Sequence, residues 1–197
     1  MSSDTVVAVT PADADVPRNR RQEETFRKVL QAGMEMLRES SYADLTVRAV
    51  AARARVAPAT AYTYFSSKNH LIAEVYLDLV RQAPFFTDVN DTRLSRVQQT
   101  LRSLALVIAD EPEVAIACTT AVLSNDAGVN RVRDRIGAEI HKRIKSALGP
   151  DADPQIVSAL EMTYYGALVH AGSGTLTYHQ VADRMSYVVG LILREDD

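Results

Sequence analysis

Residues 44–71 read DLTVRAVAARARVAPATAYTYFSSKNHL, and this stretch determines how the rest of the chain is organised. At helical period it divides into two short helices and the start of a third. Thr46 can cap the first helix, because its hydroxyl can accept from a free amide of the opening turn. Pro58 stands where a proline begins a helix without losing a needed donor. We therefore expect two helices joined by a tight turn at residues 55–57.

The second of these helices, residues 58–64, is rich in hydroxyl groups. It has room for about two turns and carries Thr60, Tyr62, Thr63 and Tyr64. A helix in a core would not gather so many hydroxyls, whereas a helix laid against phosphates and base edges would. The composition of this helix therefore indicates a contact with nucleic acid.

The same stretch resembles the helix-turn-helix of the tetracycline-repressor (TetR) family. The resemblance covers roughly residues 20–76 and is carried by the pattern Thr46-x-Arg48-x-x-Ala51, then Val56-x-x-x-Thr60-x-Tyr62-x-Tyr64-Phe65-x-x-Lys68. Three positions depart from the family, which usually has glycine at Arg55, serine at Ala57 and leucine at Ala61. We expect Arg55 to hold a strained turn, at about 1 kcal/mol relative to glycine if φ is positive. We expect the helix to lack a side-chain cap at Ala57, which is worth about 1 kcal/mol. We expect Ala61 to fill less of the space beneath the helix than leucine would.

The hydroxyl-rich helix and the resemblance together give a predicted DNA-binding surface, on which the family places a phosphate contact at Lys68. The predicted residues are Thr46, Arg48, Pro58, Ala59, Thr60, Tyr62, Thr63, Tyr64 and Lys68. The partner would be double-stranded DNA with a near-palindromic operator.

Charge is distributed unevenly along the chain, whose formal net charge is −3. Residues 1–17 carry three acids and no base, whereas residues 18–76 carry ten Lys or Arg and six Asp or Glu. Association with a polyanion depends on the local electrostatic field more than on the net charge of the whole chain. The positive charge thus lies in the part that bears the motif.

The N-terminal residues 1–17 have no periodicity, no basic start and no long apolar run, so we expect a disordered tail and no signal peptide. Arg18, Arg20 and Arg21 follow directly. They are either a solvated helix start or a basic arm against phosphates or the minor groove.

Apolar stripes at helical spacing continue to the C-terminus and predict an all-α fold of about nine helices. Residues 18–70 are the predicted DNA-binding domain, and residues 71–197 the predicted ligand-binding and dimerisation domain. The resemblance implies a homodimer in which the last two long helices pack against the partner, and the stripes at residues 156–168 and 181–193 could supply that surface. No stretch is apolar and long enough for a membrane span.

Sequence motifs for catalysis or a metal are absent, so we expect neither an enzyme nor a cofactor. The four histidines fall in different predicted elements, and Cys118 lies on an apolar stripe, where core packing is the default. A single cysteine excludes an intramolecular disulfide framework and fits a cytoplasmic protein.

Polar residues interrupt the predicted helix at residues 153–170, among them Glu161, Tyr164 and Tyr165. They are either paired structural groups or the orienting contacts of a ligand cavity. Tyr165 is predicted to point inward and to bond Glu161, four residues earlier, while Tyr164 faces the partner or solvent. The candidate ligand-binding residues are Phe86, Cys118, Glu161, Tyr165 and Leu168, where Phe86 either roofs the cavity or belongs to the core.

The sequence is thus interpreted as a ligand-responsive transcriptional regulator, a repressor that a small, largely apolar effector releases from its operator. The alternatives are a small-molecule-binding helical protein without operator function, and an enzyme. The hydroxyls of residues 60–64 argue against the first, and the missing catalytic constellation against the second.

Overall fold

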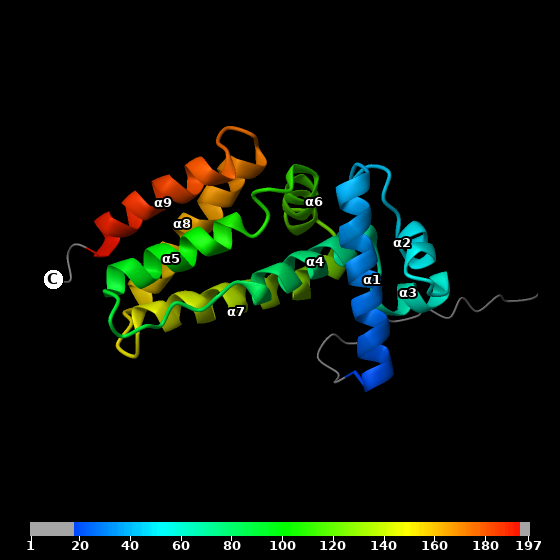
Figure 1. Ribbon diagram of the computed structural model, residues 1–197, viewed down its shortest axis with the longest axis horizontal. Coiled ribbons are helices and arrows are strands. Elements are labelled where there is room, and N and C mark those ends of the chain that lie inside the picture. Colours follow the sequence, from blue (N-terminus) through cyan, green and yellow to red (C-terminus); the bar gives the residue numbers. More distant parts are fainter. Residues whose placement is uncertain (1–17, 194–197) are drawn as a thin grey trace, which may run out of the picture.

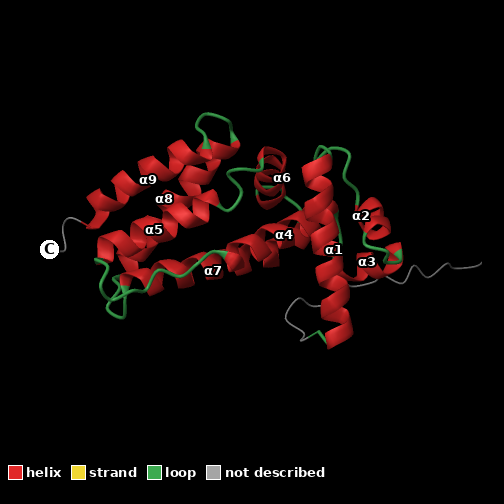
Figure 2. Cartoon of the chain, in the orientation of Figure 1, coloured by secondary structure: helices red, strands yellow, loops and turns green. Residues whose placement is uncertain are grey.

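The computed structural model describes residues 18–193, and this part of the chain forms nine helices and no strand (Figure 1, Figure 2). The predicted all-α fold is confirmed. The expected disordered tail, residues 1–17, lies outside the described residues. The helices are α1 (Arg20–Glu39), α2 (Val47–Arg53), α3 (Pro58–Tyr64), α4 (Lys68–Gln82), α5 (Arg93–Leu106), α6 (Pro112–Val122), α7 (Ala127–Leu148), α8 (Pro154–Gly172) and α9 (Tyr178–Ile192).

Helices α1, α2 and α3 pack together at one end of the molecule (Figure 1). The ring of Phe26 on α1 stacks on Phe65, which directly follows α3, with 5.0 Å between ring centroids. Three small side chains, Val47, Ala51 and Ala61, form a separate buried cluster where α2 meets α3. A helix as short as α3 is held by such packing rather than by its own hydrogen bonds.

Helix α4 connects this end to the remaining helices and lies alongside α7 (Figure 1). The Ser67 hydroxyl caps α4 by accepting from the amide of His70 at 2.9 Å. Most of the residues of α4 between His70 and Val80 are buried, because α1, α6 and α7 cover it on several sides. The helix that begins beside α3 is therefore also a core helix of the second half.

Helix boundaries in the second half follow local caps. Thr177 and Gln180 form a capping box before α9. Helix α7 begins at Ala127, because the Asp126 side chain caps its first turn. Helix α8 runs two residues beyond its expected end at His170.

Much of the apolar stripes at residues 156–168 and 181–193, on α8 and α9, faces the interior of the subunit, and a dimer surface on these helices stays a prediction. Val157 and Leu160 of α8 are buried, as are Val181 and Val189 of α9. A different set of large apolar side chains on these helices is exposed: Met162, Tyr165, Val169, Tyr187 and Leu191.

Candidate nucleic-acid interface and ligand cavity

The turn between α2 and α3 has the strained backbone expected from the sequence. Arg55 has a φ of 55°, in the left-handed region, and it is the only non-glycine residue between 18 and 193 with positive φ. The next amide, that of Val56, donates to the carbonyl of Ala51 at 2.9 Å and closes the turn. Ala57 precedes α3 and makes no side-chain cap. Both expected weaknesses of this turn are confirmed.

All nine predicted DNA-binding residues have solvent-accessible surface. Those on α3 and its start face outward, with Pro58, Ala59, Tyr62 and Thr63 exposed and Thr60 half-buried. Arg48 and Thr46 are exposed at the start of the neighbouring α2. The exposed side of α2 and α3 thus offers hydroxyls, a phenol and a guanidinium, which are groups that bond phosphates and base edges.

Two of these groups also stabilise the motif itself. The Thr46 hydroxyl accepts from the Ala49 amide at 3.1 Å and caps α2. The Tyr64 ring packs against Phe26 and Phe65, with centroids 6.1 and 6.3 Å away. Tyr64 therefore contributes to the contact between α1 and α3 as well as to the predicted surface.

Lys68 holds the start of α4 to the loop before α2. Its ammonium donates to the carbonyl of Tyr42 at 2.9 Å and to that of Ala43 at 3.4 Å. The ammonium also lies 4.2 Å from the centroid of the Tyr42 ring. An ammonium has three donors, so these two carbonyls leave one donor for the phosphate contact that the sequence predicts.

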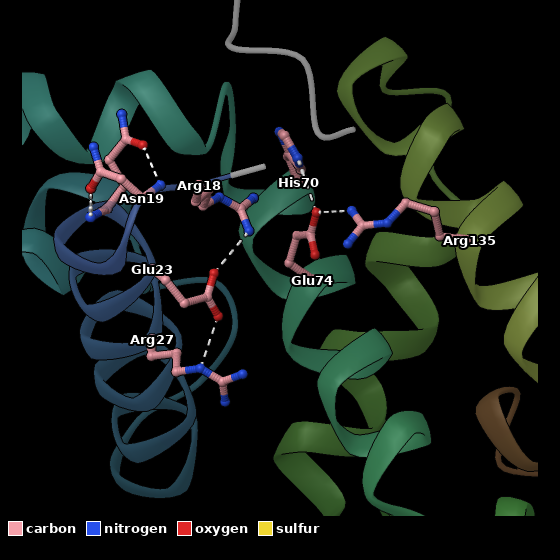
Figure 3. A network of polar contacts seen from close by, with 8 residues as sticks. Arg18, Asn19, Glu23, Arg27, His70, Glu74 and Arg135 are labelled. Carbon is pink, nitrogen blue, oxygen red and sulfur yellow. Dashed lines mark hydrogen bonds and ion pairs between the residues drawn. The ribbon is translucent and has the colours of Figure 1, made fainter. Parts of the chain in front are cut away.

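Arg18 packs back onto the protein. Its guanidinium lies 3.6 Å over the Phe26 ring. It also lies 3.5 Å from a Glu23 carboxylate oxygen (Figure 3). This contact favours the structural interpretation for Arg18, whereas Arg20 and Arg21 are exposed on the first turn of α1.

An apolar cavity of about 80 Å³ lies among α4, α6, α7 and α8. Three of the predicted ligand-binding residues line it, namely Cys118, Tyr165 and Leu168. The other two do not, which is a correction: Phe86 lies in the loop after α4, and the carboxylate of Glu161 bonds Nδ1 of His141 at 2.8 Å.

The burial of the two adjacent tyrosines of α8 differs from the prediction, whereas the predicted place of Tyr165 at the cavity agrees with the cavity lining. Tyr164 is fully buried, with its hydroxyl 2.8 Å from that of Tyr76 and 3.3 Å from the carbonyl of Leu104. Burial raises the pKa of the Tyr164 phenol. Tyr165 is 41% exposed at the cavity wall. The predicted bond between Tyr165 and Glu161 is not formed, because the Glu161 carboxylate bonds His141 of α7 instead.

Tyr76 is a cavity residue that is absent from the predicted ligand-binding set. It belongs to α4, lines the cavity and bonds Tyr164. A polar hydroxyl on an otherwise apolar stripe was the available signal, since buried tyrosine hydroxyls usually find a partner.

Comparison with known proteins identifies the relatives of this architecture. Residues 29–75 match the sequence profile described as bacterial regulatory proteins, tetR family. An uncharacterised HTH-type transcriptional regulator of Mycobacterium tuberculosis is 67% identical over 202 residues, covering 98% of this chain and 94% of the relative. The chain belongs to the TetR family. This TetR-family chain is a transcriptional regulator, as its relatives are, and its helix-turn-helix is the α2–α3 unit.

Further similarities extend over most of the chain. The HTH-type transcriptional repressor KstR of Rhodococcus jostii is 27% identical, covering 97% of this chain and 92% of that protein. A TetR regulator structure from Rhodococcus sp. RHA1 has a TM-score of 0.77 at 19% identity, over 89% of this chain and 98% of that one. The Thermus thermophilus repressor FadR, solved with lauroyl-CoA, has a TM-score of 0.66 at 16% identity, over 87% and 95%. Between residues 18 and 193 of this TetR-family regulator, no helix is both long and apolar enough for a bilayer.

Proposed function

We propose that this TetR-family regulator is a cytoplasmic repressor that binds a near-palindromic operator as a homodimer and leaves it when a small, largely apolar effector binds. Residues 18–70 are the DNA-binding domain in this proposal, and residues 71–197 the ligand-binding and dimerisation domain. The observation that carries it is Tyr76, which lines the cavity from α4, the helix whose first turn follows the α3 recognition helix.

The chemistry of the cavity supports an apolar effector. Every side chain on its wall is uncharged, and Ile136, Leu168 and Val169 supply much of the lining. Pockets for drug-sized ligands usually measure about 300–1,000 Å³, so a larger effector must push the walls apart. A ligand that favours such an expanded state shifts the population away from the state that fits the operator. The related fold of FadR, which holds lauroyl-CoA, supports an acyl chain as the first compound to test.

The test is a gel-shift assay with DNA from upstream of the protein's own gene. The assay is repeated with lauroyl-CoA and with any compound that native mass spectrometry finds co-purified with the protein. We expect a shifted complex in the absence of added compound, and its loss with a compound that fills the cavity. A protein that shifts this DNA no better than a scrambled duplex would contradict the operator function.

Lys68→Ala tests the predicted interface within the same assay. An ammonium that contacts a phosphate does not distinguish one base from another. The variant should therefore bind all DNA sequences more weakly, and to a similar extent. The slope of affinity against salt should fall by about one unit per half-site. A changed base preference at constant slope would show instead that Lys68 reads bases.

A further inference from the structure

The first turn of α7 is in direct contact with the segment that leaves the recognition helix. Ser66 and Ser67 follow α3 and its C-cap residue Phe65. The Ser67 hydroxyl donates to a carboxylate oxygen of Asp126 at 2.5 Å. The other oxygen of Asp126 accepts from the Gly128 amide at 2.8 Å, which caps α7. One side chain therefore holds both the start of α7 and the start of α4.

Gly128 allows this approach because it has no side chain. A Cβ at this position would lie 2.3 Å from the Ser66 hydroxyl oxygen, 3.2 Å from Oδ1 of Asp126 and 3.5 Å from Cβ of His70. Ser66 is itself held, since its amide donates to Nδ1 of His70 at 3.2 Å and its hydroxyl lies 3.1 Å from the same nitrogen. Moving the Ser66 hydroxyl out of the way would therefore break a contact in the α3–α4 turn.

Helices α4 and α7 are also joined at two places further along. An Arg135 nitrogen of α7 lies 2.6 Å from the carboxylate of Glu74 on α4, and His70 approaches the same carboxylate at 3.8 Å (Figure 3). Glu74 is only 3% exposed, so separating the pair would leave a buried charge without compensation. At the end of α4, the buried Arg143 of α7 donates to the carbonyls of Arg81 and Ala83 at 2.8 and 3.0 Å.

We propose that α7 sets the position of the recognition helix, with Asp126 and Gly128 as positioning residues for DNA binding and with α4 and α7 moving as one arm. The arm is held together at its start, in its middle and at its end by the contacts above. A displacement of α7 at the cavity, where Ile136 forms part of the wall, then reaches Ser66 and Ser67 directly. The DNA part of this inference rests on the proposed operator function.

The test uses Gly128→Ala in the full-length protein. Its added methyl group should push Ser66 out of place. The matched control is Gly137→Ala on the same helix, where a Cβ meets only the Tyr165 hydroxyl, at 3.4 Å. The suppressor is Ser66→Ala with Gly128→Ala, compared with Ser66→Ala alone. It removes the nearest crowding oxygen and leaves that of Asp126 at 3.2 Å. Hydrogen exchange by mass spectrometry reports on the free protein, and the gel-shift assay reports on upstream DNA.

In Gly128→Ala we expect amide exchange in residues 58–70 to rise about tenfold while α5 and α9 keep their protection, because one overpacked contact opens only its own region. Affinity for DNA should fall about tenfold. Both effects should be absent from the Gly137→Ala control and reversed in the suppressor.

Two results would overturn the inference. One is exchange in residues 58–70 that matches the control, and the other is a rise that the suppressor leaves in place. If the exchange pattern appears as expected but the wild-type protein binds no upstream DNA, the operator function fails while the positioning role of α7 stands.

Discussion

Arg55 shows how a single residue can be unfavourable locally and still leave the motif intact. Its positive φ belongs to a conformation that glycine adopts freely and that costs other residues about 1–2 kcal/mol. The Val56 amide bond to Ala51 and the buried Ala61 hold the turn in spite of this cost. The strain is therefore local and removable.

Arg55→Gly should raise the free energy of unfolding by about 0.5–1 kcal/mol, because relief of the left-handed strain exceeds the entropy that glycine adds to the unfolded chain. Urea denaturation followed by circular dichroism measures this change. Ala52→Gly, inside α2, is the control and should lower stability by about 1 kcal/mol. Equal destabilisation by both variants would contradict the strain.

At this scale the sequence predicted backbone features better than side-chain partners. The strain at Arg55 and the missing cap at Ala57 follow from residue types within a few positions of each other. The partner of Glu161 could not be found that way, because His141 comes from another helix. Lys68 likewise bonds carbonyls about 25 positions earlier in the chain.

At the scale of whole helices, the starts were predictable and the buried side of α8 was not. Thr46, Ser67 and Thr177 cap helices through contacts three residues along the chain, so the sequence alone indicates them. Helix α8 is apolar on nearly all sides, and its periodicity therefore does not show which side faces the core. This ambiguity explains why the burial of Tyr164 and Tyr165 was predicted in the wrong order.

Tyr164→Phe should lower the free energy of unfolding by about 1–3 kcal/mol, because it leaves the buried Tyr76 hydroxyl without a partner. Tyr165→Phe should change it by less than about 0.5 kcal/mol. Chemical denaturation at neutral pH compares the two variants. Tyr165→Phe as the more damaging change would reverse the assignment.

The raised pKa of Tyr164 adds a pH dependence to the same comparison. Below the unfolded-state pKa of about 10 the buried phenol is neutral in both states, and its stabilisation is complete. Above that pH the unfolded chain ionises first, so stability falls as pH rises towards the folded-state pKa. Tyr164→Phe should show a shallower alkaline decline than the wild type.

Gly172 marks a close approach of α8 to α6. A Cβ there would lie 2.4 Å from Cγ2 of Thr119 and 3.1 Å from its Cβ, so Gly172→Ala should lower stability by about 1–3 kcal/mol through overpacking. Gly166→Ala, on the same helix with open space around it, should instead raise stability by about 0.5–1 kcal/mol. Thermal melting of the two proteins should therefore shift in opposite directions.

At the scale of the whole molecule, the excess of positive charge and the exposed apolar side chains of α8 and α9 lie in different parts of the chain. The motif-bearing residues 18–76 carry the excess of positive charge, while α8 and α9 expose Met162 (73%) and Tyr187 (68%). Large apolar side chains gathered on neighbouring helices are typical of an interaction surface. This arrangement suits two subunits that meet through α8 and α9 and present their positively charged parts to DNA.

Light scattering at micromolar concentration should therefore give twice the chain mass of 21.6 kDa. Met162→Asp combined with Leu191→Asp should shift the protein towards monomer, because it places charges on the apolar contact. Val89→Asp, in the loop after α4 and 90% exposed, is the control and should stay dimeric. A wild-type protein of single-chain mass would remove the dimer and its two-half-site geometry.

Cys118 is the only cysteine in the sequence, lines the cavity and is 1% exposed, and burial raises the pKa of its thiol. In the closed protein a thiol reagent should thus meet almost no thiolate and very little accessible sulfur. Every labelling event then requires the helices around the cavity to separate for a moment. The labelling rate at Cys118 therefore measures how often the cavity opens. A bound effector should lower this rate.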